Sequence, residues 1–378
     1  MDGGDYSLKR VEILMSKLRK LYAYARLVKA QTGKPWLRQA MEIRGLASGR
    51  QRIGIEEYYE LGIFDDNFFP GQEKSRCVGW RSSAKIDRVL NDDSWRATAN
   101  DKVLNYALLV HYGFPVPETL AIYSPSGRRV AQEPLLRNKE ELDAYLGTAV
   151  TFPVFIKPIH GTYGRGTFCL KESLNNNAGF LDIRGQAVSR SELLATCKNK
   201  HFGGMLFQTR LVQHPEVVAL VGDTVSCVRV IVALSADGSP SIVLAFWKIG
   251  REKNITDNFC MGESGNLLAW IDTDTGEVKR VIDGLWPTGT ERTDHPDTKT
   301  RLVGARLPDW SSALALCRSA AELFPGLRLQ HWDIAFSDRG PILMELNTEA
   351  DLGVPQYLGR SAFLTERIDA LMGSRSRD

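Results

Sequence analysis

The feature that most constrains the fold is a two-strand pattern near the end of the sequence, in residues 331–347. Two apolar runs lie on either side of a short polar turn that ends in Gly340. A glycine at this place suits the left-handed backbone of a three-residue hairpin loop. The runs are too apolar for a ribbon that lies on the surface, so the pattern predicts a β-hairpin within a packed sheet.

The alternation of side chains fixes which residues of this hairpin face one another. If Ser337 faces Pro341, then Asp333 faces Glu345. Asn347 lies one step further along on the same face. Three oxygen-bearing side chains are therefore predicted to converge.

Two carboxylates that face each other across neighbouring strands repel, and this destabilises a sheet unless a cation lies between them. Oxygen ligands without imidazole or thiolate favour Mg²⁺, which commonly shares a few carboxylates with nucleotide phosphates. The alternative is an acidic patch that faces solvent. We predict a site for one or two Mg²⁺ ions, with Mn²⁺ as a substitute, at Asp333, Glu345 and Asn347.

A second hairpin, in residues 154–170, has a glycine-rich tip. Glycines let backbone N–H groups turn toward one point, as a phosphate chain requires, and a lysine from the preceding apolar strand adds a positive charge. The alternative is an ordinary turn. The residues predicted to bind nucleotide here are Lys157, His160, Gly161, Thr162, Tyr163, Gly164 and Gly166.

Two further segments are weaker candidates for nucleotide binding. Lys102 lies at the start of a helical pattern, residues 99–112, where a solvated first-turn lysine is the alternative. Residues 205–211 form an apolar strand that runs into a polar segment, and its backbone could contact an adenine edge, although an ordinary strand end has the same pattern. The residues of this segment that we predict to contact adenine are Gln208, Thr209, Arg210 and Leu211.

Composition bounds the class of protein. The chain has 378 residues, 43% of them hydrophobic, which is enough for two or three packed lobes. A net charge of +3 gives no general case for a nucleic-acid partner. The six cysteines lack metal-ligand spacing and no signal peptide is recognised, so we expect reduced thiols and a cytoplasmic protein. Polar residues interrupt the longest apolar tract, residues 217–234, which predicts two buried strands and no transmembrane segment.

The basic part of the chain is its N-terminal region. Residues 1–60 hold 12 Lys and Arg against 7 Asp and Glu, and residues 7–30 have the spacing of an amphipathic helix. Packing on the main body with solvated lysines is the favoured interpretation. Binding to an anionic membrane surface or to an acidic substrate is the alternative.

Taken in chain order, these segments resemble the ATP-grasp superfamily and, within it, the sugar-transfer-associated ATP-grasp family, over roughly residues 55–365. The resemblance implies an α+β fold in which two lobes hold ATP. Gln208 departs from the family pattern, which often has an acidic residue there. The divisions predicted are a helical basic region at 1–84, an N-terminal lobe at 85–150, a glycine-hairpin lobe at 151–212, a metal-binding lobe at 213–368 and a disordered tail at 369–378.

The resemblance also implies roles for residues near the phosphates. Arg229 lies between valines on a strand, where an unpaired charge is costly to bury, so we expect it in the cleft near the transferred phosphate. A structural ion pair is the alternative. Lys248 and Arg251, on the next strand, are similar candidates, and Asn258 is expected on a loop over the acceptor site.

The family's usual reaction activates a carboxylate as an acyl phosphate, which an amine or another nucleophile then attacks. We therefore predict an ATP-dependent carboxylate–amine ligase that acts on small molecules, with a sugar, peptide or natural-product precursor as the kind of substrate. A kinase that phosphorylates a hydroxyl on the same fold is the alternative. A non-catalytic nucleotide-binding module is a third hypothesis, which the intact lysine and acidic residues argue against. The oligomeric state is not predicted.

Overall fold

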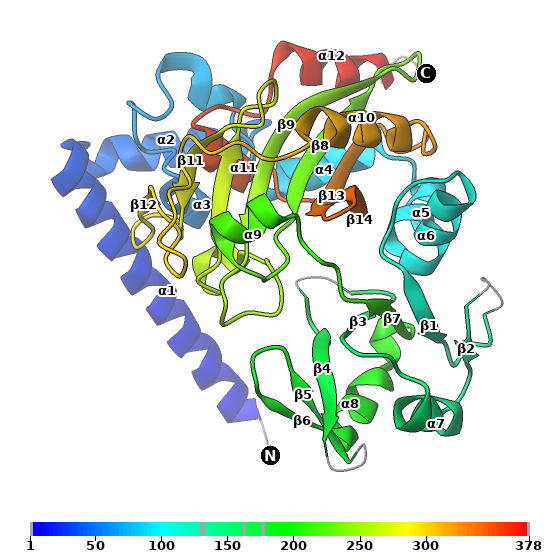
Figure 1. The fold of residues 1–378 in the computed structure, drawn as a ribbon. Helices are drawn as coiled ribbons and strands as arrows, with labels where there is room; N and C mark the ends of the chain where they lie inside the picture. Colours follow the sequence, from blue (N-terminus) through cyan, green and yellow to red (C-terminus); the bar gives the residue numbers. More distant parts are fainter. Residues whose placement is uncertain (1–2, 129–132, 162–163, 175–177, 376–378) are drawn as a thin grey trace. The chain divides into compact units, whose positions relative to one another are not determined.

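The computed structural model describes residues 3–128, 133–161, 164–174 and 178–375 (Figure 1). The chain forms two compact units, one of residues 1–87, 285–290 and 349–378, and one of residues 88–284 and 291–348. Helices occur with two β-sheets, so the predicted α+β class is confirmed. Within the described ranges, no helix has both the length and the hydropathy needed to cross a membrane.

The first unit is helical. Aromatic packing holds it together, because the Trp286 ring contacts Tyr24, Tyr59 and Phe64 at centroid distances of 5.1, 6.2 and 4.9 Å. Its helices are α1 (Gly3–Thr32), α2 (Trp36–Ser48), α3 (Ile55–Glu60), most of α4 (Trp80–Leu90), α11 (Gly353–Gly359) and α12 (Glu366–Arg375).

The first unit contains an ionic cluster around the buried Lys34 ammonium, here called the Lys34 cluster. Lys34 Nζ lies 2.9 Å from Glu42, 3.1 Å from Asp66 and 2.6 Å from the Phe64 carbonyl oxygen. Lys74 pairs with the same two carboxylates, at 2.5 Å from Asp66 and 3.3 Å from Glu42. Arg38 pairs with both as well, at 3.2 Å from each. Three cations therefore share two anions.

The C-terminal segment differs from the predicted disordered tail. Helix α12 continues to Arg375, and residues 376–378 lie outside the described residues. Ile368 and Leu371 are buried, and apolar burial stabilises the helix that carries them. The predicted lobe boundaries within residues 85–368 stay predictions.

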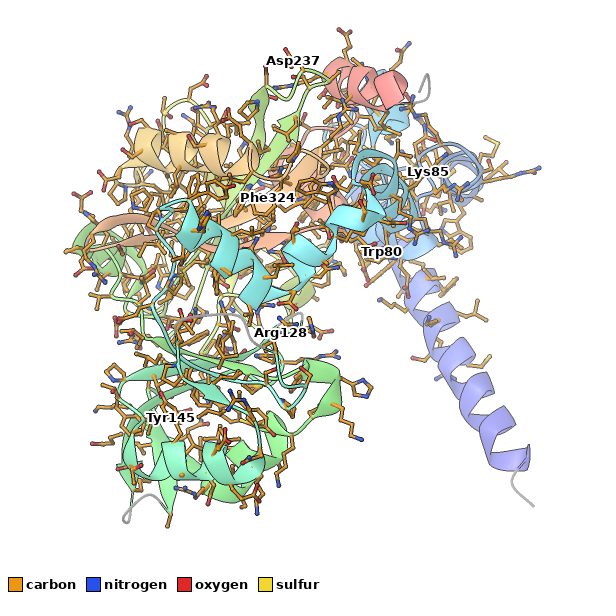
Figure 2. The ribbon with its side chains drawn as sticks, turned by 90° about the vertical axis from the view of Figure 1, so that its right-hand side faces the viewer. Trp80, Lys85, Arg128, Tyr145, Asp237 and Phe324 are labelled. Carbon is orange, nitrogen blue, oxygen red and sulfur yellow. The ribbon has the colours of Figure 1, made fainter. Side chains whose placement is uncertain are left out.

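The first sheet of the second unit has the strand order β2-β1-β7-β3-β4-β5-β6. Its core includes Phe207 and Ile156, and Tyr145 of helix α7, labelled in Figure 2, meets the Phe207 ring edge-on at 5.4 Å. The elements are β1 (Thr119–Tyr123), β2 (Leu135–Leu136), α7 (Lys139–Thr148), β3 (Val154–Pro158), β4 (Phe168–Leu174), β5 (Gly179–Asp182), β6 (Ala187–Ser189), α8 (Arg190–Cys197) and β7 (Met205–Thr209).

The second sheet has the order β12-β11-β10-β9-β8-β13-β14, and its neighbouring strands are antiparallel. Buried Trp247 and Trp332 lie in the same core as helix α10 (Trp310–Ala321), and Phe324, labelled in Figure 2, packs on Trp332 at 5.8 Å. Because side chains alternate along a strand, residues next to these tryptophans point to the opposite face. The strands are β8 (Val228–Leu234), β9 (Pro240–Ile249), β10 (Leu267–Ile271), β11 (Val278–Ile282), β12 (Glu291–Arg292), β13 (Leu329–Ser337) and β14 (Gly340–Asn347).

Two sequence-based assignments differ from the structure. The helix predicted over residues 99–112 is broken into α5 (Ala97–Asn100) and α6 (Lys102–His111), because extended Asp101 uses its side chain to cap the Leu104 N–H at 3.0 Å. Two strands were predicted over residues 217–234, but the first is helix α9 (Pro215–Val221). Pro215 at the first helical position is a helix-start signal, but the apolar residues that follow it were interpreted as a strand.

Candidate active site

The two acids of the C-terminal hairpin do face each other. Asp333 on β13 pairs with Glu345 on β14, and the next pair on that face is His331 with Asn347. The predicted register at the turn was wrong, since Ser337 pairs with Gly340 and not with Pro341. A β-bulge at Met344 supplies one extra residue, and this shift restores the pairing of the acids.

Tyr106 of helix α6 ties this bulge to the glycine hairpin. Its hydroxyl donates to the Met344 carbonyl oxygen and accepts from Lys157 Nζ at 2.7 Å. Lys157 is buried on β3, and burial lowers the pKa of its ammonium, while the charge of Glu345 opposes that shift. The described residues include no carboxylate within ion-pair distance of Lys157. Its charge is therefore available to an anion.

Lys102 joins the two predicted halves of the site. As the first residue of helix α6 it is buried, and its Nζ lies 2.9 Å from Glu345 Oε1 and 3.3 Å from the Gly161 carbonyl oxygen. His160 Nδ1 lies 3.2 Å from the Asn100 carbonyl oxygen, just before the helix. The acidic hairpin and the glycine hairpin therefore meet at one lysine.

Asp333 lies at the centre of a cationic group. Arg229 of β8 donates two hydrogen bonds to its oxygens, at 2.8 and 2.7 Å, and Lys248 of β9 lies 3.1 Å away. Burial alone raises the pKa of the Asp333 carboxyl, but the charges of Arg229 and Lys248 outweigh it and hold the pKa well below its usual range. Asn347 Nδ2 donates to the same carboxylate at 3.3 Å. The ion pair expected as the alternative for Arg229 is present, and its partner is a predicted metal ligand.

Lys248 also reaches the loop that was predicted to cover the acceptor site. Its Nζ lies 3.4 Å from buried Asp257, which accepts a hydrogen bond from the Cys227 N–H at 2.7 Å. The net effect of burial, which lowers the pKa of Lys248, and of the Asp257 and Asp333 charges, which raise it, is a raised pKa. Lys248 therefore stays an ammonium between two carboxylates.

The tip of the glycine hairpin lies against the same loop. Gly164 has a φ of +67°, and a Cβ at this position would lie 2.8 Å from Asn258 Nδ2 and 3.0 Å from Thr256 Oγ1. The positive φ and these short contacts with the ends of two side chains together favour glycine at position 164. Gly166 has the same need, because a Cβ there would lie 2.5 Å from the Phe202 ring. Thr162 and Tyr163 lie outside the described residues.

The predicted adenine segment follows β7. Gln208 is buried and its amide lies 3.4 Å from the Pro117 carbonyl oxygen, while Thr209 donates to Glu118 at 2.9 Å and Arg210 pairs with Asp223 at 2.5 Å. No hydrogen bond within the described part of the chain uses the backbone N–H or C=O of Leu211. The segment therefore presents backbone groups, and its three polar side chains are already engaged.

Arg251 is directed elsewhere. It forms two hydrogen bonds with Asp297, at 2.7 and 2.6 Å, and this partner raises the pKa of its guanidinium. Among the described residues, Arg251 forms no ion pair with Asp333 or Glu345. Of the four predicted catalytic residues, Arg229 and Lys248 contact the acids, Asn258 lies at the hairpin tip, and Arg251 belongs to a separate ion pair. Their roles stay predictions.

Sequence reasoning missed three residues of this group. Tyr106 lies one helical turn after Lys102, on the same side of α6, and Asp257 precedes Asn258 and pairs with Lys248. His331 lies two residues before Asp333, a spacing that puts both on one face of β13. It is fully buried and its Nδ1 has no hydrogen-bond partner among the described residues. Burial and the Arg229 charge lower the pKa of His331 to about 3, so its imidazole is neutral.

Comparison with known proteins identifies the family. Sugar-transfer associated ATP-grasp proteins match residues 81–370. The chain belongs to this family. The resemblance inferred from the motifs is therefore confirmed, although the match begins at residue 81 rather than near residue 55. No curated protein matches the sequence.

Three solved structures are similar to the chain at low sequence identity. The biotin carboxylase domain of 2-oxoglutarate carboxylase from Hydrogenobacter thermophilus is 12% identical, with 77% of this chain and 48% of that chain covered and a TM-score of 0.41. The ATP-grasp ligase PsnB is 17% identical, with 76% of this chain and 63% of that chain covered and a TM-score of 0.37. The VanG D-Ala:D-Ser ligase from Enterococcus faecalis is 13% identical, with 75% of this chain and 64% of that chain covered and a TM-score of 0.41. The chain thus spans about half to two thirds of the length of these proteins.

The site of this ATP-grasp chain has an excess of positive charge. Four lysine and arginine side chains and three carboxylates make the contacts that form this site. The cations are Lys102, Lys157, Arg229 and Lys248, and the anions are Asp257, Asp333 and Glu345. A buried surplus cation is costly unless an anion joins it, so the arrangement suits phosphate.

The oxygen donors fit a hard divalent cation. Glu345 has a partly exposed carboxylate with one ion pair, and Asn347 uses only its amide nitrogen within the described structure, which leaves its carbonyl oxygen as a donor. No group of three or more His, Cys, Asp or Glu side chains able to hold a metal is found within the described ranges. Mg²⁺ typically takes one or two carboxylates together with phosphate oxygens, and the two acids and one amide match that need.

Proposed function

We propose that this protein is an ATP-dependent ligase that activates a carboxylate as an acyl phosphate and joins it to an amine. The observation that carries the proposal is the position of Lys102, which lies 2.9 Å from Glu345 and 3.3 Å from the Gly161 carbonyl oxygen. A nucleotide phosphate chain held by the glycine hairpin therefore has the acidic pair beside it. Membership of the ATP-grasp family supports the same reaction class.

In this proposal the residues of the chain align and neutralise the phosphates. Lys157 and Lys102 contact the phosphate chain, and Leu211 offers its backbone to adenine. Mg²⁺ held by Asp333, Glu345 and Asn347 would neutralise charge that develops on the phosphate oxygens. Positioning and electrostatic stabilisation account for most of the catalysis in phosphoryl transfer, so no covalent protein nucleophile is required.

The two steps balance without a further reactant. The substrate carboxylate oxygen attacks the γ-phosphorus, and ADP leaves. The amine then attacks the acyl carbon, phosphate leaves, and the nitrogen loses a proton. Arg229 and Lys248 lie where they can stabilise the acyl phosphate, since both point to the face of the sheet that carries Asp333.

A screen of carboxylic acids and amines for ADP release tests the proposal. Release of ADP and phosphate that depends on both an acid and an amine, with an amide product detected by mass spectrometry, is expected. A stable phosphorylated hydroxyl compound would instead establish a kinase. Absence of nucleotide turnover with every acid and amine, in a protein that binds MgATP, would contradict the ligase.

Nucleotide binding is measured first by thermal unfolding. MgATP should raise the unfolding temperature relative to Mg²⁺ alone, because a ligand at 100 times its Kd adds about 2.7 kcal/mol of stability. AMP with Mg²⁺ is the control, since it lacks the β- and γ-phosphates that the glycine hairpin is proposed to hold. An equal shift with AMP and ATP would contradict phosphate recognition.

A further inference from the structure

An apolar surface is exposed on helices α1 and α2 of the first unit. On α1, Met15, Leu18 and Tyr22 are 48%, 52% and 55% exposed and follow each other at steps of three and four residues, so they share one side of the helix. We call this the α1–α2 surface and define it by Met15, Leu18, Tyr22, Trp36, Leu37 and Met41.

The two helices contribute to one continuous surface. The Trp36 ring of α2 meets the Tyr22 ring edge-on at a centroid distance of 5.6 Å. Leu37 follows Trp36 and is 73% exposed, and Met41 lies one helical turn further on. Water-facing apolar residues that gather in this way mark an interaction site more often than scattered ones do.

Positive charge surrounds this surface. Residues 15–32 contain five basic and no acidic residues. Lys20 is paired with Glu60 at 2.7 Å, whereas the other four have no ion-pair partner among the described side chains. Two of them lie over the exposed rings, with the Arg26 guanidinium 5.9 Å from the Tyr22 centroid and Lys29 Nζ 5.7 Å from the Trp36 centroid.

We propose that the α1–α2 surface binds an anionic lipid surface, with α1 lying in the plane of the headgroups. Tryptophan and tyrosine favour the boundary between headgroups and acyl chains, and free lysine and arginine side chains are attracted to anionic lipids. The Met15, Leu18, Leu37 and Met41 side chains would enter the outer acyl region. The proposal is independent of the ligase reaction.

Two other kinds of partner, a second copy of the chain and a nucleic acid, fit this surface less well. A second copy would bring the same cationic side chains together, and residues 15–32 offer no acid to neutralise them. A nucleic acid would satisfy the cations, but its phosphate backbone has no apolar surface to cover the exposed leucine and methionine side chains. A lipid surface satisfies both properties at once.

Co-sedimentation of the full chain with vesicles tests the proposal. We expect binding to vesicles of phosphatidylcholine mixed with phosphatidylglycerol, little binding to phosphatidylcholine alone, and loss of binding at high salt. The double variant Arg26→Gln, Lys29→Gln should lower the partition coefficient about thirtyfold, because each basic side chain near an anionic leaflet adds a factor of about five. The variant Arg137→Gln, Lys139→Gln removes the same charge from the second unit and should bind as the original chain does.

The apolar part of the surface has its own test. The variant Leu37→Gln, Met41→Gln changes two exposed residues, so its unfolding temperature should be unchanged while vesicle binding falls at least tenfold. Tyr112→Gln, at a residue of the second unit that is 59% exposed, is the matched control and should bind normally. Brominated phosphatidylglycerol should quench tryptophan fluorescence, and Trp36→Phe should abolish that quenching.

Three outcomes would overturn the proposal. These are no binding to anionic vesicles at low salt, equal binding by the surface variants and their controls, or a dimer in light scattering that the same surface substitutions dissolve. The last result would assign the α1–α2 surface to self-association.

Discussion

Each unit contains an ionic cluster, and the two clusters differ in how their cations are paired. In the Lys34 cluster of the first unit, each of the three cations, Lys34, Arg38 and Lys74, contacts both carboxylates, Glu42 and Asp66. In the candidate active site of the second unit, four cations stand against three carboxylates, and Lys157 contacts only a tyrosine hydroxyl among the described residues.

The difference separates a structural cluster from a ligand site. Removing charges from water costs several kcal/mol per ion, and only good pairing offsets it. Every cation of the Lys34 cluster has carboxylate partners, so this cluster meets the condition by itself and serves the fold. In the candidate active site, Lys157 has no carboxylate partner among the described residues and needs an anion to join it, and this is why the four substitutions below should act differently in the two places.

The largest effect is expected from Glu345→Gln, in the candidate active site of the second unit. The variant should fold normally and lose turnover by about a thousandfold, since metal-assisted charge stabilisation is worth several kcal/mol. ADP release under saturating MgATP is the measurement. Asp338→Asn at the tip of the same hairpin is the control, and unaltered turnover in a folded Glu345→Gln variant would remove Glu345 from the site.

Lys34→Met should act on stability alone. Lys74 and Arg38 remain as partners of both carboxylates, so the variant loses only the hydrogen bonds that the Lys34 ammonium donates, and the cost should be about 1.5–3 kcal/mol. Denaturant unfolding measures the loss. The shift in unfolding temperature caused by MgATP should stay the same, and a reduced shift would show that the Lys34 cluster also serves the nucleotide.

Lys157→Ala should weaken nucleotide binding without lowering stability. It removes a buried cation without a carboxylate partner, so the free protein should keep or gain stability. The affinity for MgATP should fall by about ten- to a hundredfold, as for the loss of one hydrogen bond to a charged group. Calorimetric titration with MgATP provides the affinity. A loss of stability as large as that of Lys34→Met would place Lys157 among structural residues.

The smallest effect concerns acid pH. Burial alone raises the pKa of Glu42, but hydrogen bonds from Lys34 and Tyr58 outweigh it, so the net pKa lies below the ordinary 4.5. The stabilisation by Glu42 is complete above pH 4.5 and is lost as pH falls through the lower, folded-state pKa. The free energy of unfolding of the original chain should therefore decline more steeply in this range than that of Glu42→Gln. Equal slopes would contradict the assignment.

The parts of the site that depend on local alternation could be predicted from the sequence. Asp333 and Glu345 were paired correctly because each lies on a strand with an unmistakable alternating pattern. The turn register was nevertheless wrong by one residue, and the bulge at Met344 cancelled that error. A bulge leaves no clear sign in the sequence, because any residue of a strand can be the extra one.

The parts that depend on distant partners could not be predicted. Arg251 and Asp297 lie 46 positions apart with other elements between them, so nothing local shows that they pair. The sequence also does not show that residues 285–290 and 349–378 belong to the N-terminal unit. Trp286, for example, contacts Tyr24, which is far from it in the sequence. His331 had a readable signal in its spacing from Asp333, but its missing partner is visible only in three dimensions.

The extra residue at Met344 divides the hairpin into two pairing registers. Between Met344 and the turn, the pairs run from Ile334 with Leu343 to Ser337 with Gly340. Beyond Met344, Asp333 pairs with Glu345, and the Tyr106 hydroxyl holds this part by donating to the Met344 carbonyl oxygen. The turn can therefore change in sequence without rotating the carboxylates. Deleting Met344 would merge the two registers and leave Glu345 opposite Asp333, but it would remove the carbonyl oxygen to which the Tyr106 hydroxyl donates.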